Sequence, residues 1–210
     1  MKEEFAGLAD ILETLIARGE SIAVAESLTG GGLAQALTSL PGSSQVFRGS
    51  VTAYQNEIKS ALLQIPEELI TEFGAVSEEV AAAMAHGLKD LMGSTWSIST
   101  TGVAGPGPVE GVPAGTVWVA IDGPISQTLQ LELSGTREIV RNATIAGAIA
   151  AFARILKTRE PQEEDERGIK WSFYCAPVLV NLFVLLALRK VAHFAMLLAM
   201  LEYLLVIYLK

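Results

Sequence analysis

The chain is poor in the side chains that most metal sites and catalytic triads need. Its 210 residues include one cysteine, Cys175, and two histidines, His86 and His193. A single cysteine excludes an internal disulfide, and three such ligands are too few to predict a structural zinc site. His86 lies in an alanine-rich helical run, where a packing or surface role is the more common one. A Ser-His-Asp triad therefore has little support.

Basic residues are also scarce. The chain has 15 lysines and arginines and 23 aspartates and glutamates, which gives a net charge of −8 and a pI near 4.8. Because nucleic-acid-binding surfaces are basic, we expect no nucleic-acid partner. The first residues, Met1 to Glu4, contain no apolar signal region, so we expect a cytoplasmic protein rather than a secreted one.

Charge is distributed unevenly along the chain. Residues 1–158 mix charged and apolar residues as a globular domain does, and residues 159–170 are mostly polar. The last region, residues 171–210, holds only Arg189, Lys190, Glu202 and Lys210 as charges. These shifts predict a globular domain over residues 1–158, a charged linker over 159–170 and a hydrophobic tail over 171–210.

The tail contains two stretches that approach the roughly 20 residues needed to span a bilayer as a helix. Trp171 to Leu188 has no charge, and Val191 to Leu209 has only Glu202. Arg189-Lys190 is too short and too charged to connect two spans easily. One membrane segment, or a helix lying at the interface, is therefore favoured, and either would attach the protein to the inner face of a membrane. An oligomerisation helix pair and a non-native terminus are the alternatives that need no membrane.

Strand-like runs alternate with helical patterns before the linker. The expected strands are Ile22–Ala25, Gly49–Tyr54, Trp96–Thr100, Thr116–Ile121 (buried on both faces) and Thr128–Leu133 (one face in water). The expected helices are Glu3–Arg18, Leu33–Leu37, Glu57–Leu63, one opened by Pro66, Ser77–Leu91 and Thr136–Leu156. This alternation predicts an α/β fold, a three-layer α/β/α sandwich with a mostly parallel or mixed sheet, followed by the hydrophobic helical tail.

The turn after the first strand carries the first candidate site. Residues 25–32 read Ala-Glu-Ser-Leu-Thr-Gly-Gly-Gly and connect a strand to a helix. Such a turn leaves backbone N–H groups free for an anion or an oxyanion, with Ser27 at the carboxyl end of the strand. The simpler alternative is that Ser27 or Thr29 only caps the following helix.

Two further groups accompany this turn. Tyr54 ends a strand and Lys59 lies one turn into the next helix, while Arg137 and Arg141 share one face of the last helix. Each has an ordinary structural alternative: a tyrosine over the core, a solvated lysine or an exposed basic face. The second glycine-rich loop, residues 101–108, lacks the lysine of a P-loop and the context of a dinucleotide fingerprint.

Six motifs in order resemble one known family. The runs are AESLTGG, LPGSS, YQNEIK, GAVSEEVAAAMAHG, TTGVAGPGP and GTVWVA, and the likeness covers about residues 5–156. They closely resemble the CinA carboxy-terminal domain, the nicotinamide-nucleotide amidase family. The resemblance implies hydrolysis of the carboxamide of nicotinamide mononucleotide (NMN), which yields nicotinic acid mononucleotide and ammonia. It further implies a homodimer that uses no cofactor and no metal.

By motif position, the resemblance implies a catalytic pair of Ser27 and Lys59, assisted by Tyr54, Thr101 and Arg141. We expect the serine to attack the carboxamide carbon, a partly neutral Lys59 to act as general base, and Tyr54 to relay or orient the proton. We expect Gly30, Gly31 or Gly102 to hold the oxyanion and Arg141, with Arg137, to face the phosphate or ribose. The substrate-binding residues expected in all are Thr29, Gly30, Gly31, Asn56, Thr101, Gly102, Ala104, Gly105, Arg137 and Arg141.

The chain departs from the family pattern in a few places. Leu28 stands where cysteine is common, Gln64 and Ser50 replace frequent glycines, and the loop after Gly107 is shorter than usual. Substrate preference depends most on that loop. A nucleotide-binding or regulatory module without catalysis is the competing hypothesis. The chain begins too close to the amidase-like region for us to expect the additional pyrophosphatase domain of longer relatives.

Overall fold

Five strands form one mixed sheet in the part of the chain that the computed structural model describes, residues 7–159. They are β1 Ile22–Glu26, β2 Phe47–Thr52, β3 Trp96–Gly102, β4 Thr116–Asp122 and β5 Gln127–Glu132. Their order across the sheet is β2-β1-β3-β4-β5. β1 pairs in parallel with β2 and β3, whereas β4 is antiparallel to both β3 and β5. The linker beyond residue 159 and the hydrophobic tail, 171–210, lie outside the described residues.

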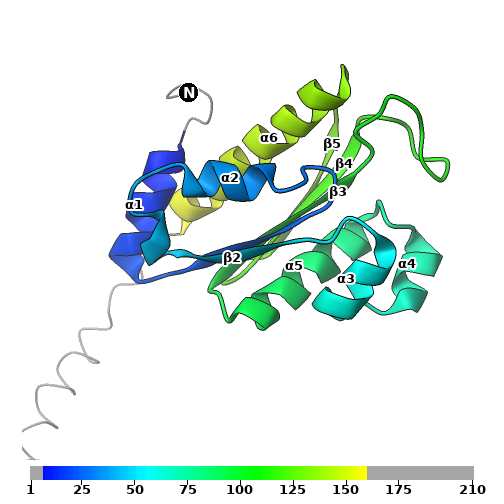
Figure 1. Ribbon diagram of the computed structural model, residues 1–210. Coiled ribbons are helices and arrows are strands. Elements are labelled where there is room, and N and C mark those ends of the chain that lie inside the picture. The colour runs from blue at the N-terminus through cyan, green and yellow to red at the C-terminus, as the bar shows by residue number, and fades with distance from the viewer. Residues whose placement is uncertain (1–6, 160–210) are drawn as a thin grey trace, which may run out of the picture. The chain divides into compact units, whose positions relative to one another are not determined.

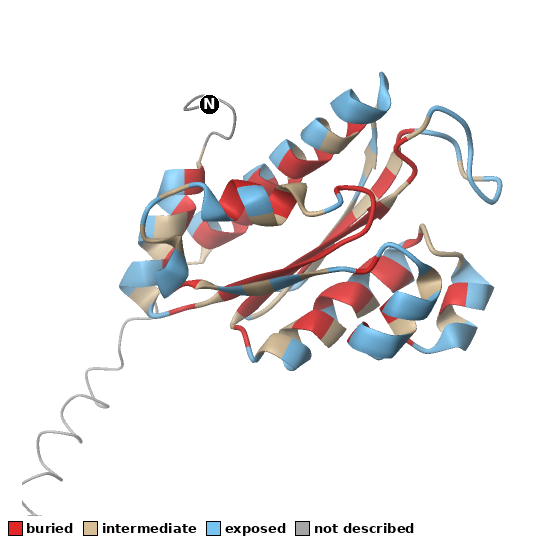
Figure 2. Cartoon of the chain, in the orientation of Figure 1, coloured by how far each residue is buried: buried red, intermediate tan, exposed pale blue. Residues whose placement is uncertain are grey.

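Helices cover both faces of this sheet (Figure 1). They are α1 Leu8–Arg18, α2 Gly32–Thr38, α3 Asn56–Leu63, α4 Glu67–Phe73, α5 Glu78–Met92 and α6 Arg137–Thr158, with a short 3-10 turn, η1, at Ser43–Gln45. α1, α2 and α6 lie on one face, and α3, α4 and α5 lie on the other. The buried residues of the helices lie on their sides toward the interior of the domain (Figure 2), and α3 and α4 pack against α5. The predicted α/β/α sandwich is confirmed.

The core has one part on each side of the sheet. Because side chains alternate along a strand, Ile22 and Val24 of β1 join the cluster under α1, α2 and α6, while Ala23 and Ala25 join the one under α5. α5 also packs very closely against α3. A Cβ added at Gly87 would lie 2.0 Å from the carbonyl oxygen of Leu63. Only glycine allows this approach, which fixes α3, the helix that carries Lys59, against the domain.

Helix ends follow the expected chemistry. Gly19 takes the left-handed conformation just after α1, with φ of 61°. Ser77 and Thr136 accept hydrogen bonds from backbone N–H groups in the first turns of α5 and α6, at 3.3 and 3.4 Å. These three boundaries confirm the sequence signals for where α1 ends and where α5 and α6 begin.

Several details differ from the expectations. α1 begins at Leu8 rather than Glu3, and Gly7 is the residue before it. β2 begins at Phe47 and ends at Thr52, two residues earlier than predicted at each end. Pro66 is the residue before α4 rather than part of its first turn. β4 is not buried on both faces, because Trp118 remains partly exposed on a face that α5 covers incompletely. The periodicity alone could not show how far α5 reaches across the sheet.

One described helix has the length and composition of a membrane span. It is α6, with 22 residues, and half of its most apolar window is buried inside the domain. Its buried face includes Phe152, whose ring packs edge-on against the ring of Trp96, with 5.3 Å between the ring centroids. These contacts identify α6 as a core helix of this α/β domain.

Candidate active site

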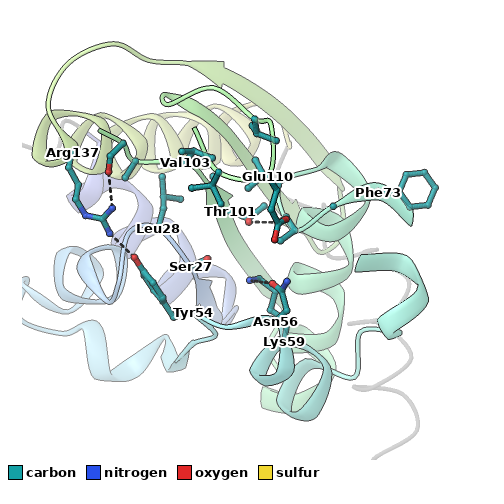
Figure 3. Close-up of a pocket in the computed structure, with 18 residues that line it drawn as sticks. Ser27, Leu28, Tyr54, Asn56, Lys59, Phe73, Thr101, Val103, Glu110 and Arg137 are labelled. Carbon is teal, nitrogen blue, oxygen red and sulfur yellow. Dashed lines mark hydrogen bonds between the residues drawn. The ribbon is translucent and has the colours of Figure 1, made fainter. Parts of the chain in front are cut away.

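A pocket of about 320 Å³ lies at the carboxyl ends of β1 and β3 (Figure 3). Open α/β sheets place their ligands at this edge, and the volume suits a small molecule. Nine of the predicted site residues line it: Ser27, Tyr54, Asn56, Lys59, Thr101, Gly102, Ala104, Gly105 and Arg137. Segments far apart in sequence therefore meet at one site.

Ser27 is placed by the pairing of β1 with β3. Its backbone N–H donates to the Thr100 carbonyl at 2.9 Å, which extends the parallel ladder one residue beyond β1. Thr101 follows on β3, and its hydroxyl donates to the Ala75 carbonyl at 2.7 Å. The hydroxyl of Ser27 has no such partner among the described residues and lies in the pocket. Ser27 is thus held by its backbone while its side chain remains available.

Lys59 is one of the most buried charged residues of the domain, with 2% of its surface exposed. Its ammonium donates to Oδ1 of Asn56, three residues earlier on α3, at 3.1 Å. Burial lowers the pKa of Lys59 below its ordinary value of 10.5, although the negative charges of Glu110 and Glu57 oppose this effect. A buried lysine with a lowered pKa has the property that a general base requires.

Tyr54 and Arg137 form the other side of the pocket. Nη2 of Arg137 donates to the Tyr54 hydroxyl at 2.6 Å, and Nη1 donates to the Gly105 carbonyl at 3.1 Å. In Figure 3, Ser27 lies between this pair and Lys59. The sequence predicts that Tyr54 relays or orients the proton that passes from Ser27 to Lys59. In this structure its hydroxyl instead bonds to Arg137, away from the lysine.

The glycine turn after Ser27 is organised by Glu26. This fully buried carboxylate accepts hydrogen bonds from the N–H groups of Gly31, Leu33 and Ala34 at 3.0, 3.0 and 2.7 Å. The N–H of Gly30 donates to the Ser27 carbonyl at 3.1 Å. The N–H groups expected to hold an oxyanion at Gly30 and Gly31 are therefore already occupied. The N-cap residue of α2 is Gly31, the Glu26 carboxylate accepts the first N–H groups of the helix, and neither Ser27 nor Thr29 caps it.

Four predicted site residues support the pocket rather than line it: Thr29, Gly30, Gly31 and Arg141. Nη2 of Arg141 donates to the Thr29 carbonyl at 2.7 Å and packs against Gly30. The Thr29 hydroxyl shares a 2.7 Å hydrogen bond with that of Thr100. Arg141 thus holds the turn in place from α6, whereas Arg137 lines the cavity.

Two groups in the pocket were missed by the sequence reasoning. The first is Leu28, whose backbone N–H has no hydrogen-bond partner among residues 7–159. The residue after a nucleophile on a strand-to-helix turn is a common oxyanion donor, so this position could have been named. The second is Glu110, on the loop between β3 and β4. The sequence indicated only that the loop containing Glu110 is shorter than usual.

The charges around the pocket are few. Its lining contains two basic side chains, Lys59 and Arg137, and one carboxylate, Glu110. Within residues 7–159, no three histidine, cysteine, aspartate or glutamate side chains lie close enough together to hold a metal ion. The arrangement offers a hydroxyl and a desolvated amine in one cavity, also lined by Leu28, whose backbone N–H has no partner among residues 7–159. This combination suits acyl transfer.

Known proteins resemble this chain over the same region. The sequence model of the CinA C-terminal domain matches residues 6–156. A CinA-like protein of Parasynechococcus marenigrum is 44% identical over 154 residues, 71% of this chain and 37% of that protein. A CinA-like protein of Prochlorococcus marinus is 50% identical over 115 residues, 54% of this chain and 27% of that protein. This chain thus matches between about a quarter and two fifths of the length of these relatives.

Solved structures show the same fold. Competence damage-inducible protein A from Klebsiella pneumoniae is 33% identical and superposes with a TM-score of 0.71, over 73% of this chain and 97% of that one. The competence/damage inducible protein CihA from Agrobacterium tumefaciens is 30% identical, with a TM-score of 0.66, over 72% of this chain and 96% of that one. The similarity therefore extends across almost the whole of each of those shorter proteins.

Proposed function

Because this chain belongs to the family of CinA C-terminal domains, we propose that it hydrolyses the carboxamide of NMN to nicotinic acid mononucleotide and ammonia. One observation supports this proposal above the others. Ser27 and the buried Lys59 line one pocket at the carboxyl edge of the sheet, and the pKa of Lys59 is lowered by burial. A serine hydroxyl needs a neighbouring base to attack an amide, and a neutral amine can act as that base.

In the proposed reaction, Oγ of Ser27 attacks the carboxamide carbon while Lys59 accepts the hydroxyl proton. The backbone N–H of Leu28 stabilises the oxyanion, a contribution of about 3 kcal/mol for one well-placed donor. Lys59 then returns its proton to the departing nitrogen, and ammonia leaves. Water attacks the resulting ester, and Lys59 again takes the proton. Lys59 passes this proton to Oγ as the ester bond breaks, which releases the acid and regenerates Ser27.

Arg137 is the proposed partner of the substrate phosphate. Its guanidinium is exposed at the mouth of the pocket and already bonds to Tyr54 and Gly105. Arginine binds phosphate through paired N–H donors, and each Nη of Arg137 carries a second N–H besides the one used in these hydrogen bonds. Tyr54, which is 53% exposed, would then orient the sugar-phosphate end rather than relay a proton.

A second candidate function is nucleotide binding without catalysis. It is favoured by the hydrogen bond that Lys59 makes to Asn56, because the structure contains no hydrogen bond between Lys59 and Ser27 among the described residues. For the amidase, Nζ of Lys59 must turn from Asn56 toward Ser27 when substrate arrives. Catalytic hydrogen bonds are often long before substrate binds, so this geometry is compatible with both functions.

Ammonia release from NMN separates the two candidates. We expect turnover by the full chain, loss of turnover in Ser27→Ala, and normal turnover in Ser39→Ala, a serine at the end of α2 outside the pocket. Nicotinamide and nicotinamide riboside serve as substrates that lack the sugar-phosphate and the phosphate. Saturable NMN binding with no ammonia at any enzyme concentration would support the binding module instead.

A further inference from the structure

The loop between β3 and β4 carries a carboxylate into the pocket on a rigid turn. The backbones of Val109 and Val112 exchange two hydrogen bonds, at 3.1 and 2.9 Å, across a two-residue turn made of Glu110 and Gly111. Both central residues have positive φ, 50° for Glu110 and 81° for Gly111. Such turns favour Asn or Asp followed by Gly, and glutamate is a poor choice for the first position.

Glu110 does not use its charge elsewhere in the described structure. No ion pair or side-chain hydrogen bond involves it among residues 7–159, although it faces a pocket containing Lys59 and Arg137. In Figure 3 its carboxylate points toward the side of the cavity that holds Lys59 and Asn56, whereas Arg137 lies on the opposite side of Ser27. The pocket therefore has an acidic wall near the catalytic pair and a basic wall at its mouth.

This charge distribution matches a dipolar substrate. In NMN the ring nitrogen is quaternary and positively charged, and a single ring carbon separates it from the carbon that bears the carboxamide. When the carboxamide reaches Ser27, the ring charge must lie close beside it. The phosphate lies at the far end of the ribose, where Arg137 is placed.

We propose that Glu110 determines substrate charge specificity by facing the cationic pyridinium ring, so that the pocket selects N-ribosylated nicotinamide over uncharged-ring analogues. This inference rests on the proposed function, because it takes NMN as the substrate. The role is separate from the reacting atoms: Glu110 contributes to binding of the ring, while Ser27 and Lys59 act on the carboxamide.

Glu110 also faces Lys59, so its effect on binding of the ring must be separated from its effect on the Lys59 amine. The test uses protein with Lys59→Met, which removes the amine and blocks turnover, and compares it with Lys59→Met/Glu110→Gln. Calorimetry measures binding of NMN and of its reduced form, whose dihydropyridine ring has no charge but whose carboxamide, ribose and phosphate are the same. Lys59→Met/Glu132→Gln is the matched control, since Glu132 is an exposed carboxylate on β5 outside the pocket.

We expect Lys59→Met protein to prefer NMN over the reduced form, and Glu110→Gln to reduce that preference by about five- to tenfold. Glu110→Asn should have the same effect while suiting the turn better, so a loss of preference there is not a loss of folding. Equal weakening of both nucleotides, or no change in the preference, would overturn the proposal. Turnover of NMN by the Lys59→Met protein would overturn the Ser-Lys mechanism instead, and binding of neither nucleotide would overturn both.

Discussion

The carboxylate of Glu26 and the backbone N–H of Gly31 form a 3.0 Å hydrogen bond at the start of α2. The same carboxylate accepts two more backbone N–H groups, so it neutralises the positive end of α2 from inside the protein. A helix start that already holds a carboxylate is not free to bind a substrate anion. Glu26 instead holds the turn that carries Ser27 and leaves the Leu28 N–H free.

Replacing Glu26 by glutamine should be costly, although the two side chains have nearly the same shape. The amide would keep one acceptor and would direct N–H donors at other donors in a fully buried place. Hydrogen bonds to a charged group contribute about 1.5–3 kcal/mol, so we expect Glu26→Gln to lose about 2 kcal/mol of unfolding free energy and most NMN turnover. Urea unfolding measures the first quantity. Glu79→Gln, in the exposed first turn of α5, should lose under about 1 kcal/mol and keep activity.

Lys59→Met should abolish turnover without destabilising the fold. The folded protein holds the Lys59 proton less tightly than the unfolded chain, so at neutral pH the charged amine opposes folding, by about 1.4 kcal/mol for each tenfold difference in proton affinity. Removing the amine relieves this cost, and we expect an unchanged or raised midpoint in thermal unfolding. A large loss of stability would show that Lys59 acts as a structural residue.

The matched variant is Lys89→Met on α5. Lys89 pairs with Asp122 at 2.6 Å, away from the pocket. Burial alone would raise the pKa of Asp122, but hydrogen bonds from Lys89, Ser126 and His86 outweigh it and hold that pKa below 3.8. Lys89→Met leaves the carboxylate without its main partner. We expect a loss of about 1–2 kcal/mol of stability and normal activity, the reverse of the Lys59 result.

The pH profile of kcat/KM should rise as Lys59 loses its proton. Because burial lowers the pKa of Lys59, the rise should be centred below 10.5, the ordinary lysine value. Glu110 raises this pKa, so Glu110→Gln should move the rise to lower pH. Rates measured across the alkaline range in both proteins test the sign. A shift to higher pH in the variant, or a rate independent of pH, would contradict Lys59 as the base.

Much of the fold was predictable because its signals are local. Strand runs, helix caps at Ser77 and Thr136, and the stop at Gly19 depend on neighbouring residues only, and these boundaries were correct. The position of β2 and the partial exposure of Trp118 were not predicted correctly. Both depend on which strand or helix lies alongside, and a single sequence does not contain that information.

The grouping of the candidate site residues was predictable from their motifs, and their individual contacts were less predictable. Ser27, Tyr54 and Lys59 meet in one pocket as the motif order indicated. The assignment of Gly31 as an oxyanion donor overlooked Glu26, whose side chain folds back over the turn, and that of Gly30 overlooked its hydrogen bond to the Ser27 carbonyl. Arg137 and Arg141 share a helix face, yet one faces the cavity and the other the Thr29 carbonyl. Spacing along α6 could not separate these roles.

The division between the two arginines gives a last prediction. Arg137→Gln removes the basic group at the pocket mouth and frees the Tyr54 hydroxyl, so we expect KM for NMN to rise about tenfold. Nicotinamide riboside lacks the phosphate, and its kcat/KM should change less than twofold in the same variant. Arg154→Gln, an exposed arginine further along α6, is the control and should leave both substrates unaffected. Equal losses for NMN and the riboside would mean that Arg137 supports the loop through Gly105 rather than binding phosphate, because a phosphate contact cannot affect a substrate that has no phosphate.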